Sequence, residues 1–270
     1  MTLTDCFNGA WRDAWRAALK MPHLFIMLFV VLLGFVYLGD HRIAIQHSAG
    51  ADPAAPGQAA TIALLSVVLL ILTVLLSIVL SIKIMRLSLL GEVNQTNLAL
   101  VGRVLLLHII IGCAAMVIGL VIGISAALIG VILSVASVHL SKAIFLLCAV
   151  LIGLFTFGAA FYVAMRLNLL SPHVATGGRY EWRKAWHDTR GRFWSMVGTV
   201  ILTSLPALFF YIVLAGARMS YVRHANFGDH LYYALAILSA LAVLALQASS
   251  AASYAWLYRR YALALKTVAA

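Results

Sequence analysis

The amino-acid chain contains long runs of apolar residues that are interrupted only by short polar segments. Residues 61–82 carry no charged side chain, and 38 uncharged residues separate Arg103 from Lys142. A helix needs about 20 apolar residues to cross the hydrocarbon core of a bilayer. Hydrophobic residues make up 64% of the chain and charged residues only 10%, whereas soluble domains are roughly 45–50% apolar and 25% charged. We therefore expect an integral membrane protein.

The apolar runs predict six transmembrane helices in a single domain that covers residues 1–270. The predicted fold class is an all-α polytopic membrane protein whose six helices form three hairpins, each preceded by a cytosolic interfacial amphipathic helix. Residues 39–60 are interpreted as a polar loop and residues 129–141 as an apolar turn, because neither segment has the pattern of a further span. The spans are expected at residues 23–38, 61–82, 104–128, 143–165, 195–217 and 231–257.

The first of these spans has two interpretations. We expect it to remain in the protein as an anchor, because the polar segment before it is too long for a signal peptide. The small residues at 48–51 leave a cleaved signal peptide as the alternative, although they lie far beyond the apolar run.

Lysines and arginines are unequally divided between the two sides of the predicted spans. The amino end, residues 83–103, residues 166–194 and the carboxyl tail together hold 15 of the 19, and the loops on the other side hold four. Segments that face the cytosol are enriched in these residues, so both termini are expected in the cytosol. The formal net charge of +11 is then a consequence of topology, and no nucleic-acid partner is expected.

Two short motifs occur twice in the chain. WRDAW at residues 11–15 returns as WRKAW at residues 182–186, each in a basic amphipathic segment just before a span. MRLSLL at residues 85–90 returns as MRLNLL at residues 165–170, each at the end of a span. We interpret the chain as three units of one kind, although the middle unit lacks the tryptophans.

The segment between the fourth and fifth spans carries the most specific pattern. It contains Arg166-Leu167, then Pro172, Ala185-Trp186, Thr189-Arg190-Gly191 and Phe193-Trp194. This pattern resembles the six-span membrane domain attached to some bacterial glycerophosphodiester phosphodiesterases, and the related stand-alone YciC-type inner-membrane proteins. The resemblance implies a multi-pass protein of a bacterial inner membrane. The catalytic part of that family is a separate soluble barrel, so no hydrolytic residue is carried over to this chain.

Cations and tryptophans at the expected cytosolic surface are the candidates for a binding site. They would contact anionic lipid headgroups, or a membrane or cytosolic protein partner. The simpler interpretation is that they only anchor helices at the interface. Lys184, Asp188 and Arg192 have the i, i+4 spacing of ion pairs that would brace their helix. The candidate residues are Arg12, Arg16, Trp182, Arg183, Lys184, Arg190 and Arg192.

No set of residues in the sequence suggests catalysis or a cofactor, and we expect no enzymatic activity. All eight acidic residues are expected in loops or surface helices, whereas carboxylates inside spans mark proton or ion pathways. Histidines gather on the expected outer side, where imidazole and carboxylate could bind zinc or copper. Their six-residue spacing is not a ligand signature, so no metal is expected. The weak candidates are His41, His47, His224 and His230.

Two functions remain open. The first is a non-enzymatic inner-membrane protein that organises lipid or docks a partner, and the second is a small permease or channel with a path among the three hairpins. A lipid-modifying enzyme is disfavoured, because the sequence offers no nucleophile, base or metal set for one. The small residues at 248–253 favour close packing of helices. Polar side chains would instead line a transport path; they are Ser66, Thr73, Ser77, Gln247, Ser250 and Tyr254.

Overall fold

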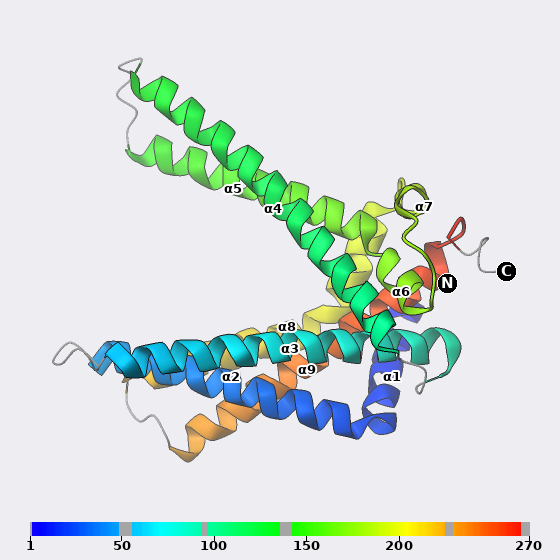
Figure 1. Cartoon of the computed structure of the whole chain (residues 1–270), viewed down its shortest axis with the longest axis horizontal. Helices are drawn as coiled ribbons and strands as arrows, with labels where there is room; N and C mark the ends of the chain where they lie inside the picture. The colour runs from blue at the N-terminus through cyan, green and yellow to red at the C-terminus, as the bar shows by residue number, and fades with distance from the viewer. Residues whose placement is uncertain (1, 49–55, 93–96, 136–141, 225–228, 266–270) are drawn as a thin grey trace.

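The computed structural model describes residues 2–48, 56–92, 97–135, 142–224 and 229–265. These residues form α-helices and no strand (Figure 1). Six of the helices are long and apolar enough to cross a membrane, which confirms the prediction of an all-α polytopic membrane protein. The helices are α1 (Leu3–Lys20), α2 (Pro22–Ser48), α3 (Pro56–Leu90), α4 (Leu98–Val135), α5 (Lys142–Leu167), α6 (Leu170–Ala175), α7 (Trp182–Asp188), α8 (Phe193–His224) and α9 (His230–Tyr261).

The long helices are arranged in two groups that meet at one end of the molecule (Figure 1). The helices α2, α3, α8 and α9 run side by side, and α4 and α5 lean away from them as a separate pair. Each long helix packs against its neighbour in the chain, α2 against α3, α4 against α5 and α8 against α9. The short helices α1, α6 and α7 lie where the groups meet. This side of the molecule is termed the α1 end, and the opposite side is termed the far end.

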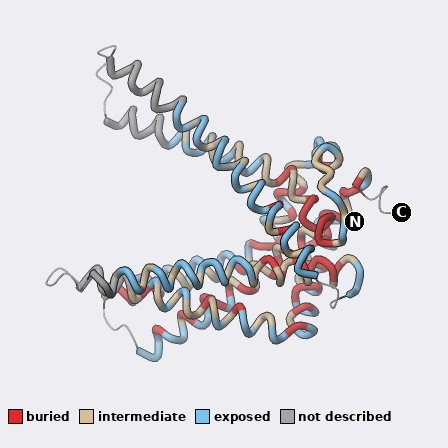
Figure 2. Tube along the Cα trace, in the orientation of Figure 1, coloured by how far each residue is buried: buried red, intermediate tan, exposed pale blue. Residues whose placement is uncertain are grey.

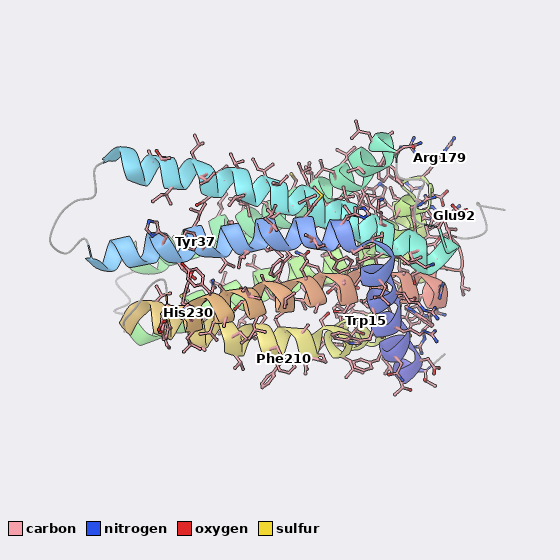
Figure 3. All side chains as sticks on the ribbon, turned by 90° about the horizontal axis from the view of Figure 1, so that it is seen from below. Trp15, Tyr37, Glu92, Arg179, Phe210 and His230 are labelled. Atoms are coloured by element: carbon pink, nitrogen blue, oxygen red, sulfur yellow. The ribbon has the colours of Figure 1, made fainter. Side chains whose placement is uncertain are left out.

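Polar side chains gather at the α1 end (Figure 3). Trp15 and Arg179 lie there, whereas Tyr37 and His230 lie at the far end. Between the two ends the long helices present mostly apolar side chains to their surroundings, such as the exposed Phe210. This distribution is that of helices that cross a membrane with their ends in water.

A stripe of small residues packs α1 across the end of the bundle. At the start of the helix, Thr2 and Asp5 form a capping box in which each side chain accepts a hydrogen bond from the backbone N–H of the other. At Gly9 the ring of Trp256 lies so close that a Cβ atom would overlap it. The amphipathic helix predicted at the amino end is therefore also a packed part of the core. Its buried residues are Cys6, Gly9, Ala10, Asp13, Ala14 and Ala17.

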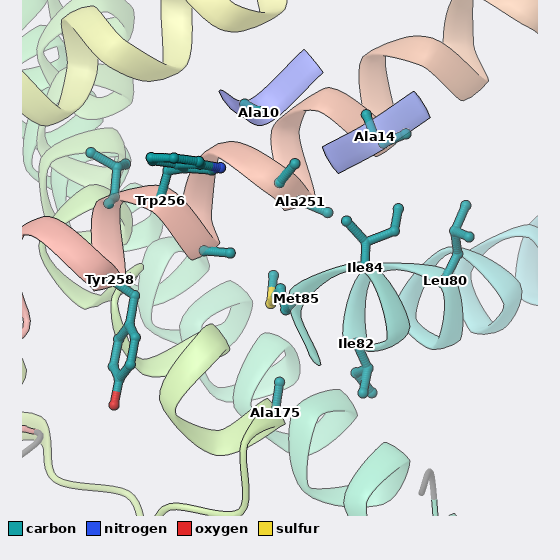
Figure 4. Packing of buried hydrophobic residues seen from close by; sticks show 14 of the residues in the cluster. Ala10, Ala14, Leu80, Ile82, Ile84, Met85, Ala175, Ala251, Trp256 and Tyr258 are labelled. Atoms are coloured by element: carbon teal, nitrogen blue, oxygen red, sulfur yellow. The ribbon is translucent and has the colours of Figure 1, made fainter. Parts of the chain in front are cut away.

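The hydrophobic core is concentrated at the α1 end, while the described side chains of α4 and α5 are mostly exposed (Figure 2). Figure 4 shows Ala251 of α9 between Ala14 of α1 and Ile84 of α3, and Trp256 of α9 beside Ala10 of α1. Five of the six residues 248–253 are buried. Small side chains let helices approach closely, so these residues confirm the packing interpretation.

Parts of two predicted connections are helical. The helix α2 continues to Ser48 and α3 begins at Pro56, so both reach into the loop predicted at residues 39–60. The helix α4 extends to Val135, although a turn was predicted at residues 129–141. The helix α4 continues because the residues before Val135 contain no charge or proline that would end it. The helix α2 continues because its polar end has partners on neighbouring helices.

Among the residues that the structure describes, no short helix precedes the middle pair of long helices. The helix α4 begins at Leu98, and no separate element precedes it after α3 among the residues that the structure describes. The interfacial helix expected before this pair is therefore not a separate element there. Residues 98–103 carry only one charge, on Arg103, so they simply extend the apolar helix.

Candidate functional site

Three cations share one face of α1. Arg12, Arg16 and Lys20 are four residues apart, a spacing that places side chains on the same side of a helix. They line a cavity of about 400 Å³, which the last turn of α3 and the end of α9 complete. Arg259 is the cation that α9 contributes. This cavity is termed the α1 pocket.

Asp13 is the acidic residue in the lining of the α1 pocket, and it joins three helices. Its Oδ2 atom accepts hydrogen bonds from Ser88 Oγ at 2.7 Å and from Trp256 Nε1 at 3.0 Å. Its Oδ1 atom lies 3.9 Å from Arg16 Nη1. Because Ser88 belongs to α3 and Trp256 to α9, Asp13 fixes the rotation of α1 that turns its cations toward the pocket.

The α1 pocket carries an excess of positive charge. Four cations, Arg12, Arg16, Lys20 and Arg259, surround the single carboxylate of Asp13. Neither Arg12 nor Lys20 forms an ion pair with any residue that the structure describes. Guanidinium and ammonium groups in such an arrangement donate charge-assisted hydrogen bonds to phosphate or carboxylate oxygens. The pocket is therefore suited to an anion.

The opposite face of α1 borders an apolar groove of about 350 Å³ between α1, α2 and α9, which is termed the α1 groove. Trp11 and Trp15 line it together with Phe25 and Phe29 of α2. The polar edge of one indole is satisfied, because Trp11 Nε1 donates to the Thr203 carbonyl of α8 at 3.1 Å. Tryptophans on one face and cations on the other are typical of a helix that lies in a membrane surface.

The candidate residues near α7 do not belong to the lining of the α1 pocket. Arg183 and Arg190 are exposed, and Lys184 Nζ lies 2.6 Å from Glu181 Oε2. Trp182 is partly buried and packs against the core. The seven predicted site residues therefore form two groups, and only the two on α1 line a cavity described here.

The predicted brace along α7 is wrong. The helix ends at Asp188, so Arg192 lies beyond it and instead has its guanidinium 5.3 Å from the ring centroid of Tyr261. The Asp188 carboxylate accepts hydrogen bonds from the backbone N–H groups of Ala264 and Leu265, at 3.0 and 3.1 Å. Asp188 thus holds the carboxyl-terminal segment against α7 rather than pairing with cations.

Two of the four cations of the α1 pocket, Lys20 and Arg259, were not among the predicted site residues. Lys20 continues the four-residue spacing of Arg12 and Arg16, and this signal was sufficient to identify it. Arg259 comes from the opposite end of the chain. Only the fold shows that α9 ends beside α1.

A buried ion pair at the far end joins α2 to α8. Asp40 Oδ2 accepts hydrogen bonds from Arg218 Nη1 at 2.8 Å and from Tyr232 Oη at 3.0 Å. All three residues are buried, and Asp40 and Arg218 lie within apolar spans. The prediction that all acidic residues lie in loops or surface helices is therefore wrong for Asp40. The guanidinium and the phenol compensate the loss of water around the carboxylate.

The weak metal candidates do not form a site in the part of the chain that is described. His41 and His230 lie near the far end, where the ring of His41 stacks on Tyr37 with centroids 6.1 Å apart. The side chains of His47 and His224 lie outside the described residues. Among those that are described, no three His, Cys, Asp or Glu residues are placed to hold a metal ion.

Most of the polar side chains that a transport path would use have protein partners. Ser66, Thr73 and Ser250 each donate a hydrogen bond to a carbonyl four residues earlier in their own helix. Ser77 Oγ of α3 donates to Gln247 Oε1 of α9 at 3.2 Å. These contacts satisfy the hydroxyl groups and join α3 to α9.

Comparison of the chain with protein-family models, with curated proteins and with solved structures found no match. The function of this chain must therefore be inferred from the chemistry of the residues described above.

Proposed function

We propose that this chain is a non-enzymatic membrane protein that binds anionic phospholipid headgroups at the α1 pocket, and so organises lipid or docks a partner at the membrane surface. The supporting observation is the pocket itself, in which Arg12, Arg16, Lys20 and Arg259 surround one carboxylate. The α1 groove on the opposite face of the helix is apolar, which suits acyl chains. A helix with these two faces lies where headgroups and acyl chains meet.

The proposal places the α1 end on the cytosolic side of a bacterial inner membrane, with both termini in the cytosol. The support for the orientation is that 15 of the 19 lysines and arginines belong to segments assigned to that side. The support for a bacterial inner membrane is the resemblance of residues 166–194 to the membrane domains named above.

The experiment is a binding titration of the full-length protein in detergent micelles with dioctanoyl phosphatidylglycerol, with dioctanoyl phosphatidylcholine as the uncharged comparison. The variant Arg12→Gln/Arg16→Gln removes two cations of the α1 pocket. Each Lys or Arg near an anionic surface contributes about 1 kcal/mol, so this variant is expected to bind the anionic lipid roughly 30-fold more weakly.

The matched control is Arg183→Gln/Arg190→Gln, which removes the same charge at the same end but outside the α1 pocket. We expect its affinity to stay within about twofold of the unmodified protein. A loss that occurs only in this control would move the site to α7. Equal affinity for both lipids would contradict recognition of negative charge.

A small permease or channel is the second candidate function, and the Asp40–Arg218 pair is the observation that favours it. Charged groups within spans commonly mark ion or proton pathways, and both residues lie within apolar helices. A proton or ion flux through proteoliposomes that depends on Asp40, and that Asp40→Asn abolishes, would support this function. Proteoliposomes as tight as empty vesicles would speak against it.

A further inference from the structure

The two MRLxLL motifs place an arginine at corresponding points of two helices. Arg86 lies near the end of α3 and Arg166 in the last turn of α5. Both follow a buried methionine, and both arginines are buried, with 7% and 4% of their surface exposed. In each, the Nε atom is buried and has no hydrogen-bond partner in the described part of the protein. The two sites are therefore a matched pair whose other contacts can be compared.

The charge of Arg86 has a partner within the protein, and so do its two terminal nitrogens. Its Nη1 atom donates a hydrogen bond to the Ala175 carbonyl of α6 at 3.1 Å. Its Nη2 atom lies 3.6 Å from Glu92 Oε2. The charge and two of the donor nitrogens of this guanidinium therefore have partners within the chain.

Arg166 has aromatic neighbours instead of acceptors. Its guanidinium carbon lies 4.3 Å from the ring centroid of Trp186 and 5.6 Å from that of Tyr162. Seven of the eight acidic residues are described, and none of them forms an ion pair with it. Its side chain donates no hydrogen bond to a described residue. Both rings lie within cation–π distance of the guanidinium, and neither ring provides an oxygen acceptor for its N–H groups in the described structure.

An arginine in this position needs an oxygen acceptor from outside the described chain. A guanidinium carries a full positive charge, and a buried charge without a partner is strongly unfavourable. Trp186 and Tyr162 are about 40% exposed, so the aromatic side of the site borders the surroundings. Aromatic residues at the end of a span lie at the level of the headgroups, where phosphate oxygens are the abundant acceptors.

We propose that Arg166 binds the phosphate of a membrane phospholipid, with Trp186 and Tyr162 packed beside the glycerol region of the same lipid. This Arg166 site is separate from the α1 pocket, which contains no residue of α5 or α7. It goes beyond the proposed function, because it binds through the phosphate that every phospholipid carries rather than through net negative charge.

The experiment counts phospholipids on the full-length protein by native mass spectrometry during a titration with dioctanoyl phosphatidylcholine. Arg166→Gln is expected to lose one bound lipid, with the affinity of that site reduced about tenfold or more because a charge-assisted contact is removed. Arg166→Lys keeps the positive charge at this position and is the control for folding. It loses the planar guanidinium that lies beside Trp186, so it is expected to bind the lipid more weakly than the unmodified protein. Arg86→Gln is the matched control and is expected to keep every lipid.

Three outcomes would overturn the Arg166 site. Full lipid occupancy in both Arg166 variants would leave the arginine with a structural role only. Loss of lipid in Arg86→Gln as well would assign the loss to the folding of the α1 end. Displacement of the lipid by millimolar inorganic phosphate, with equal stabilisation of the protein, would make free phosphate the ligand. Repeating the titration in Arg12→Gln/Arg16→Gln separates this proposal from the α1 pocket, because the Arg166-dependent lipid is expected to remain.

Discussion

The Asp40 carboxylate and the Arg218 guanidinium form a buried ion pair, 2.8 Å apart, between two helices that are distant in the sequence. Tyr232 adds a third helix through its hydroxyl group. This contact joins α2, α8 and α9 through polar groups at the far end.

Removal of either partner of this pair is expected to destabilise the protein. Arg218→Leu leaves the Asp40 carboxylate buried without a counter-charge, and Asp40→Leu leaves the guanidinium in the same state; each is expected to cost about 3–5 kcal/mol. The double variant removes both charges and is expected to recover most of that loss. Thermal unfolding of the purified protein measures all three. A double variant less stable than both single variants would contradict this account.

The close approach of α1 to α9 predicts a strict need for glycine at one position. Gly9→Ala places a methyl group in the ring of Trp256 and is expected to cost about 1–3 kcal/mol through overpacking. The control is Gly198→Ala in α8, where nothing lies within 4 Å of the added Cβ atom. This change is expected to stabilise the helix by up to about 1 kcal/mol. Unfolding temperatures that fall equally in both variants would argue against a specific contact at Gly9.

Replacement of Asp13 is expected to separate stability from lipid binding. Asp13→Asn keeps an acceptor oxygen for Ser88 and Trp256, so it should fold, and it removes the negative charge from the α1 pocket. We expect anionic lipid to bind several-fold more tightly than to the unmodified protein. Asp13→Ala leaves both donors unpaired and is expected to cost about 1–3 kcal/mol for each. Weaker lipid binding by the Asn variant would show that the carboxylate itself contacts the ligand.

The orientation of the protein can be tested with single cysteines at its two ends. Arg179 lies at the α1 end and His230 at the far end (Figure 3). In a variant from which the native cysteines are removed, a membrane-impermeant thiol reagent added to intact spheroplasts is expected to label His230→Cys only. Arg179→Cys should react after the membrane is permeabilised. The reverse pattern would place the α1 pocket outside the cell.

The class of the protein could be predicted because it depends on local composition. An uncharged apolar run as long as residues 61–82 is not compatible with a soluble protein. The same argument applies to each of the six long helices. The pattern around WRDAW likewise predicted a basic amphipathic helix at the amino end, since a helix repeats every 3.6 residues. Such features need no knowledge of the other helices.

The contacts that complete the site could not be predicted, because each joins residues far apart in the chain. Asp13 and Trp256 are separated by 243 positions, and Asp40 and Arg218 by 178. No local sequence pattern predicts which helices will be neighbours in the fold. Asp40 was assigned to a loop because residues 39–60 lack the pattern of a further span. Its partner Arg218, which makes burial of the carboxylate possible, lies on another helix.

The length of α4 has a consequence for the angle between the two groups of helices. With 38 residues it is about 57 Å long, against roughly 30 Å for the hydrocarbon core of a bilayer. An overlong helix responds to such a mismatch by tilting, and α4 with α5 is the pair that stands apart from the other four spans (Figure 1). A thinner bilayer therefore requires a steeper slant of α4, so the tilt of this helix is expected to change with the thickness of the membrane around it.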